Sequence, residues 1–204
     1  MTANANRAPP RRAMLLVLLL LFFAPVIIAF AVYYGSSWRP LGRTNHGTLI
    51  DPARPLPRVV MRRVDLVGDA HNGPAAADVL MGKWSLLYIG DGECTPGCSK
   101  ALYFIHQTQL SLGNLIPRVQ RVWLAPQHCC NRSADTETQP PLIALDASGP
   151  DAAQLLALFP ADDPESTIFI IDPRGNLMMR YDVNADPKGL REDLKKLLDL
   201  SHIG

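Results

Sequence analysis

The sequence predicts an α/β domain, in which a mixed β-sheet is flanked by helices, preceded by one N-terminal transmembrane helix. Three observations support this class. A long uncharged apolar stretch lies near the N-terminus, short apolar runs bounded by glycine follow it, and segments of helical periodicity separate those runs. A chain of 204 residues is long enough for one membrane anchor and one globular domain of ordinary size.

The apolar stretch covers residues 13–34, and an α-helix of this length, rising ~1.5 Å per residue, crosses a bilayer core of ~30 Å. Arg11 and Arg12 precede it and aromatic residues follow it. The positive-inside rule therefore places residues 1–12 in the cytoplasm and the rest of the chain on the far side. A signal peptide cleaved near Ala29-Phe30-Ala31 is the alternative, and it would export the domain as well.

Residues 35–58 contain glycine and prolines without sustained periodicity, which predicts an extended linker or an arm lying on the domain. The domain itself is then expected to span residues 59–204. Its clearest strand is Trp84–Ile89, a nearly continuous apolar run typical of a central strand buried on both faces. Thr95 can cap a helix whose first position suits Pro96, and this helix is expected to run to about Leu112.

The remaining elements follow in order along the chain. We expect strands at 59–67, 119–124, 167–171 and 177–181, and helices at 150–159 and from 187 onward. A right-handed crossover makes the strands at 84–89 and 119–124 parallel, and the turn at 172–175 joins the last two strands in a hairpin. This order of elements is the thioredoxin-like arrangement.

Active groups collect at the C-terminal ends of parallel strands in such sheets. Cys94 and Cys98 lie just beyond the first core strand, with Cys94 outside the predicted helix and Cys98 one turn inside it. This spacing puts both sulfurs on one side of the turn, where they can close a disulfide or bind an ion such as copper(I) or zinc. The helix N-terminus favours the thiolate form. The spacing fits a structural disulfide equally well.

His128, Cys129 and Cys130 follow the second core strand, so their loop is expected to leave the sheet at the same end as Cys94. Each could supply a third copper ligand. The simpler alternative is structural, in which one cysteine bridges to another thiol or packs in the loop, because adjacent cysteines rarely bridge each other. The formal net charge of +1 argues against nucleic acid as a partner.

Two segments resemble the Sco/SenC family of membrane-anchored, thioredoxin-fold proteins of cytochrome oxidase assembly. GKWSLLYIGDGECTPGCSKAL (residues 82–102) is similar to that family's strand and CxxxC helix start, and FIIDPRGNLMMRY (169–181) to its late strand-turn-strand. The resemblance implies copper bound by Cys94 and Cys98 together with a distal histidine. The family's Asp-His position falls on Asp163-Pro164 here, so this histidine is missing, and Ser99 stands where the family usually has proline.

The sequence therefore predicts a single-pass protein of a bacterial inner membrane whose C-terminal domain lies in the periplasm. Its expected function is the assembly of a copper-containing cytochrome oxidase, by copper(I) handling or thiol redox at Cys94 and Cys98. The expected partners are the lipid bilayer, through residues 13–34, and oxidase subunits or other assembly factors. The alternatives are a thiol–disulfide oxidoreductase and a thioredoxin-fold interaction module whose disulfides are only structural.

Overall fold

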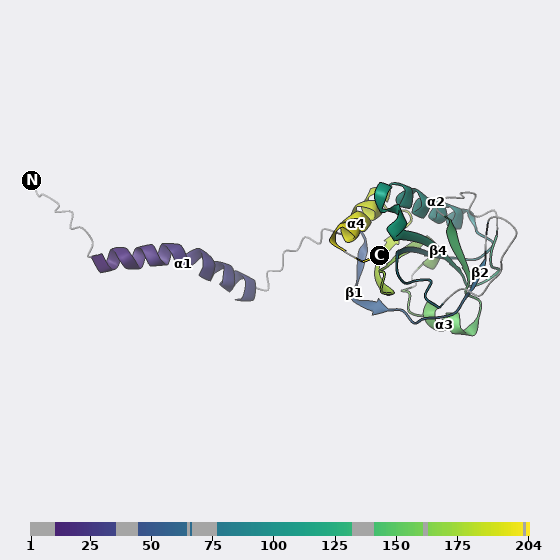
Figure 1. The fold of residues 1–204 in the computed structure, drawn as a ribbon, viewed down its shortest axis with the longest axis horizontal. Helices are drawn as coiled ribbons and strands as arrows, with labels where there is room; N and C mark the ends of the chain where they lie inside the picture. The colour runs from purple at the N-terminus through teal and green to yellow at the C-terminus, as the bar shows by residue number, and fades with distance from the viewer. Residues whose placement is uncertain are drawn as a thin grey trace, which may run out of the picture. The chain divides into compact units, whose positions relative to one another are not determined.

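The chain divides into two compact units, Met1–Thr44 and Asn45–Gly204. The computed structural model describes residues 11–35, 45–64, 66, 77–131, 141–160, 163–201 and 203–204, so His71 and His202 lie outside the described residues. The first unit contains helix α1, Arg11–Gly35 (Figure 1). Among the described helices, α1 is the one long and apolar enough to cross a membrane, over Arg12–Tyr34. It coincides with the predicted anchor.

The described strands of the second unit form one seven-stranded mixed sheet in the order β1-β7-β6-β3-β4-β5-β2. The central strand β3 pairs in parallel with β4, which pairs in parallel with β5, and the other neighbours are antiparallel. The predicted parallel pairing of the two core strands is therefore confirmed. The bounds are Thr48–Pro55 for β1, Arg62–Val64 for β2, Trp84–Ile89 for β3, Val119–Ala125 for β4, Leu142–Asp146 for β5, Thr167–Ile171 for β6 and Asn176–Asp182 for β7.

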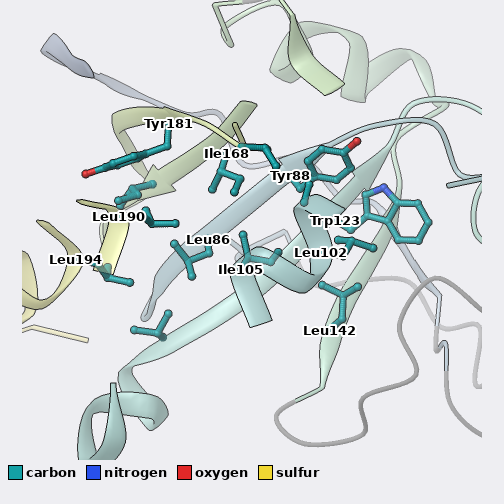
Figure 2. Packing of buried hydrophobic residues seen from close by; sticks show 14 of the residues in the cluster. Leu86, Tyr88, Leu102, Ile105, Trp123, Leu142, Ile168, Tyr181, Leu190 and Leu194 are labelled. Carbon is teal, nitrogen blue, oxygen red and sulfur yellow. The ribbon is translucent and has the colours of Figure 1, made fainter. Parts of the chain in front are cut away.

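Helices cover both faces of this sheet (Figure 1). Helices α2 (Pro96–Leu110) and α4 (Pro187–Leu200) pack on one face, where Leu102, Ile105 and Leu190 join a buried cluster with residues of the strands (Figure 2). Helix α3 (Pro150–Leu156) packs on the other face through Leu155. All residues of β3 are buried because neighbouring strands and both helical layers surround it. The predicted thioredoxin-like class is confirmed.

Three strands differ from the sequence prediction. Strand β1 lies within residues 35–58, which were expected to form a linker, and it pairs with β7 from Thr48 opposite Arg180 to Pro55 opposite Asn176. It is an edge strand with mostly exposed residues, so it has no apolar alternation and tolerates its prolines. Strand β5 was not predicted at all, and β2 covers Arg62–Val64 rather than the expected 59–67.

The start of the second unit is fixed by a buried carboxylate on α4. The backbone N–H groups of His46 and Gly47 donate to Asp193 Oδ2 at 2.7 and 3.0 Å, and the Tyr181 hydroxyl donates to the same oxygen. Asp193 is 4% exposed. These bonds hold the residues just before β1 against α4 and β7, which explains why the edge strand begins where it does.

Candidate functional site

The Cys94–Cys98 pair lies at the connection between β3 and α2, with Cys98 in the first turn of the helix, as the sequence predicted. Thr95 is the N-cap of α2, and its Oγ1 accepts a hydrogen bond from the Cys98 N–H at 3.4 Å. Pro96 occupies the first turn, where its missing N–H leaves no hydrogen bond unmade. Cys94 and Cys98 are joined by a disulfide, with their Cα atoms 5.1 Å apart.

The two sulfurs of this disulfide differ in access. Cys98 is 1% exposed and belongs to the core cluster beneath α2, whereas Cys94 is only partly buried. The Cys94 sulfur lies 3.8 Å from Ser99 Oγ. A thiol from another molecule can therefore approach Cys94 but not Cys98. This asymmetry gives the pair one attackable sulfur and one protected sulfur.

The loop after β4 lies directly against the loop that carries Cys94. The Gly92 N–H donates to the Gln127 carbonyl at 2.8 Å, and the Asn131 N–H donates to the Gly92 carbonyl at 2.6 Å. A Cβ on Gly92 would lie 2.6 Å from the Cys129 Cα, which leaves no room for a side chain. The backbones of the two cysteine loops are therefore in contact, at the carboxyl ends of neighbouring parallel strands.

His128 connects the two loops through its side chain. Its Nδ1 lies 3.0 Å from Asp91 Oδ2, and its ring is largely exposed. The hydrogen bond that His128 Nδ1 donates to Asp91 and the negative charge of that carboxylate raise the pKa of His128. The pKa of Asp91 is lowered, first by the hydrogen bond from the Glu93 N–H and then by the one from His128. Cys94 and His128 both have left-handed backbones, with φ of 55° and 48°.

Cys129 and Cys130 form a disulfide with each other, across a cis peptide bond. The sequence favoured a bridge to another thiol or loop packing, since neighbouring cysteines rarely pair. Both are partly buried and pack against the core cluster that includes Cys98. The structure thus gathers four predicted site residues, Cys94, His128, Cys129 and Cys130, on two touching loops, and Cys98 joins them from the first turn of α2.

Aromatic side chains that sequence reasoning missed lie beneath these loops. Tyr88 and Trp123 are opposite each other on β3 and β4 and lie side by side in the core (Figure 2). Trp123 Nε1 donates to the Gly90 carbonyl at 3.1 Å. A Cβ on Gly90 would lie 2.5 Å from the Tyr88 hydroxyl, so this loop rests directly on the ring. Burial, and then the charges of Glu165 and Asp163, raise the pKa of Tyr88.

Asp163 and Pro164, at which the resemblance places the Asp-His pair of the Sco/SenC family, lie just before β6. Asp163 accepts a hydrogen bond from the Ser166 hydroxyl at 2.6 Å, and the 3₁₀ helix η3, Pro164–Ser166, follows it. Within the described ranges, no three His, Cys, Asp or Glu side chains are arranged to hold a metal ion. His46 instead pairs with Glu192 at 3.0 Å, and His106 is buried in α2.

The family model described as transmembrane-like, thioredoxin-like, C-terminal domain matches residues 84–201, more than half of the chain. The chain therefore belongs to this family. No curated protein matches it in sequence.

Solved Sco proteins share its fold. Copper-bound yeast Sco1 has a TM-score of 0.58 at 15% identity, covering 72% of this chain and 96% of its own. Apo Sco1 from Thermus thermophilus has a TM-score of 0.57 at 20% identity, covering 75% and 96%. BsSco, a Sco-family cytochrome c oxidase assembly protein with a disulfide switch, has a TM-score of 0.52 at 12% identity, covering 74% and 99%. The resemblance to the Sco/SenC family is thereby confirmed at the level of the fold.

Proposed function

We propose that this member of the transmembrane-like, thioredoxin-like family is a Sco-like thiol-redox protein. It is anchored in a bacterial inner membrane by α1 and serves the assembly of a copper-containing cytochrome oxidase in the periplasm. The observation that carries the proposal is the asymmetric Cys94–Cys98 disulfide at the start of α2, with Cys94 open to another thiol and Cys98 protected in the core.

The proposed reaction is thiol–disulfide exchange with a partner protein. A partner thiolate attacks the Cys94 sulfur, the bond to Cys98 breaks, and Cys98 leaves as a thiolate at the N-terminus of α2. A second partner thiol then attacks the mixed disulfide and releases Cys94. Two electrons and two protons pass from the partner to this pair, and the same steps run backwards when the reduced pair attacks a partner's disulfide.

Copper(I) is the second candidate, as cargo of the reduced pair. Two thiolates suit this ion, and His128, Cys129 and Cys130 are the nearest predicted sources of a third ligand. The copper-bound yeast Sco1 structure supports this reading by analogy of fold. Asp163-Pro164 at the place of the distal histidine favours redox chemistry over permanent copper storage. The proposed partners are oxidase subunits or other assembly factors.

The test uses the full chain in detergent. The reduction potential of the Cys94–Cys98 pair is measured in glutathione buffers by alkylation of residues 84–100, and copper(I) is titrated anaerobically into the reduced protein. A potential above about −300 mV supports exchange, whereas a lower one indicates a structural disulfide and overturns the proposal. Copper binding that is lost in Cys94→Ser and weakened in His128→Ala supports the copper candidate. Ser99→Ala is the control, because it keeps both thiols.

A further inference from the structure

We propose that Cys129–Cys130 is a second redox pair that exchanges two electrons with Cys94–Cys98 within one molecule. The domain would then store up to four electrons as four thiols. The adjacent pair Cys129–Cys130, called the vicinal pair below, would donate electrons to Cys94–Cys98 or accept electrons from it. The inference rests on the proposed thiol chemistry of Cys94–Cys98 and extends it to a second catalytic pair.

The first support is the contact between the loops. Gly92 lies against the Cys129 Cα and is hydrogen-bonded on both sides, to Gln127 and Asn131. Cys94 follows two residues after Gly92, a separation that spans at most ~7 Å even in an extended chain. These residues lie in a turn closed by the hydrogen bond from the Cys94 N–H to the Asp91 carbonyl at 3.1 Å. Only a local loop shift is therefore needed to bring Cys94 within the ~7 Å Cα separation that a disulfide allows.

The second support is access. Cys94, Cys129 and Cys130 are partly buried and pack against one core cluster, whereas Cys98 lies inside that cluster. Cys94 is thus the more accessible cysteine of the first pair, and it packs on the same cluster as the second pair. Cys98 is placed to resolve a mixed disulfide at Cys94 from within the core, because it already bonds that sulfur in the structure.

The third support is that a structural role explains the vicinal bridge poorly. A disulfide stabilises a protein mainly by closing a loop in the unfolded chain, and the effect grows with the length of that loop. Cys129 and Cys130 are separated by one position in the sequence, so their bond closes no loop of chain. The bridge therefore restricts the unfolded chain very little, whereas its sulfurs remain available for exchange.

The exchange step balances within the molecule. Starting from the reduced first pair and the oxidised second pair, the Cys94 thiolate attacks one sulfur of Cys129–Cys130 and releases the other as a thiolate. The Cys98 thiolate then attacks Cys94, which re-forms the Cys94–Cys98 disulfide and frees the remaining vicinal thiol. Two electrons and two protons move between the pairs. A dithiol donor protein supplies the first reduction.

The decisive experiment traps the mixed disulfide in the full chain in detergent. Cys98→Ser removes the resolving thiol, so Cys94 should remain bonded to Cys129 or Cys130. After free thiols are blocked with N-ethylmaleimide, trypsin releases residues 84–100 and 122–132 as separate peptides, because Lys83, Lys100, Arg121 and Arg132 bound them. Mass spectrometry of the monomer should then find these two peptides cross-linked, at least tenfold more than in the matched control Cys94→Ser.

A measurement on the unaltered protein guards against a folding defect of the variant. One equivalent of a phosphine reductant opens one disulfide per chain, and the blocked thiols on the two peptides are then followed over time. Exchange predicts that thiols redistribute between the peptides at a constant total and at a rate independent of protein concentration. The inference is overturned if the distribution of thiols between the two peptides stops changing once the phosphine is consumed and if Cys94 is freely alkylated in Cys98→Ser. Failure of the proposed function itself looks different, since peptide 84–100 would then resist reduction in glutathione buffers.

Discussion

Gly92→Ala tests the contact between the two cysteine loops most directly. The added Cβ would lie 2.2 Å from the His128 carbonyl oxygen and 2.6 Å from the Cys129 Cα, which are backbone atoms that no side-chain rotation can move away. The loops must separate, and the hydrogen bonds from Gly92 to Gln127 and from Asn131 to Gly92 must lengthen. Two hydrogen bonds at ~1 kcal/mol each and an overpacking penalty of ~1–3 kcal/mol give a loss of about 3–5 kcal/mol.

The assay is thermal unfolding of the full chain in detergent, monitored by tryptophan fluorescence because Trp123 bonds the neighbouring Gly90 carbonyl. For a domain of this size the loss corresponds to a drop in Tm of roughly 6–20 °C. Gly97→Ala is the matched control, since its Cβ would meet nothing closer than Thr95 Oγ1 at 3.6 Å and lies in the first turn of α2. Equal Tm values for the two variants would refute the backbone contact between the loops.

Further predictions concern the rest of the domain. Asp193→Ala should lower the free energy of unfolding by about 3 kcal/mol, because the N–H groups of His46 and Gly47 and the Tyr181 hydroxyl lose their buried acceptor. Asp193→Asn should lower it less, and chemical denaturation measures both variants. The pKa of His128, followed by NMR, should lie above ~6.5 and fall in Asp91→Asn, and an unchanged pKa would contradict the contact. Because the ion pair needs protonated His128 and ionised Asp91, its contribution to stability should be lost as the pH rises through the raised pKa of His128, and also as the pH falls through the lowered pKa of Asp91. Thr95→Ala should destabilise the protein by about 1 kcal/mol, whereas Thr95→Ser, which keeps the oxygen acceptor for the Cys98 N–H, should stay near wild type in the same denaturation assay.

The sequence predicted best those elements whose signals are local. The bounds of β3 and β6 match the expected runs because both strands are continuous apolar segments bordered by turn residues. The start of α2 was predicted from a cap and a proline, and both have those roles in the structure. By contrast, β1 is mostly exposed and owes its existence to pairing with β7 and to the bonds that Asp193 makes before it. Such long-range pairing leaves no apolar pattern in the strand itself.

In the candidate site too, some features could be predicted from the sequence and others depend on contacts that leave no local sequence signal. The parallel pairing of β3 and β4 was sufficient to predict that both cysteine loops emerge at one end of the sheet. That Gly92 touches the backbone of Cys129 could not be predicted, because the signal is the absence of a side chain at one position. The bond between Cys129 and Cys130 was also missed, since the general rarity of bridges between neighbouring cysteines outweighed any local cue.

The aromatic residues under the loops connect the fold to the proposed chemistry. Tyr88 and Trp123 are fully buried on adjacent strands, and both contact Gly90, where the chain turns from β3 toward Cys94. A rigid base of this kind fixes the direction in which the loop leaves the sheet, while the left-handed residues Cys94 and His128 set the orientation of each loop. Left-handed backbones at non-glycine residues cost about 1–3 kcal/mol and cluster at functional sites. Such residues occur in both cysteine loops, and both loops lie above the buried rings of Tyr88 and Trp123. This arrangement favours disulfides that react over disulfides that only stabilise the loops.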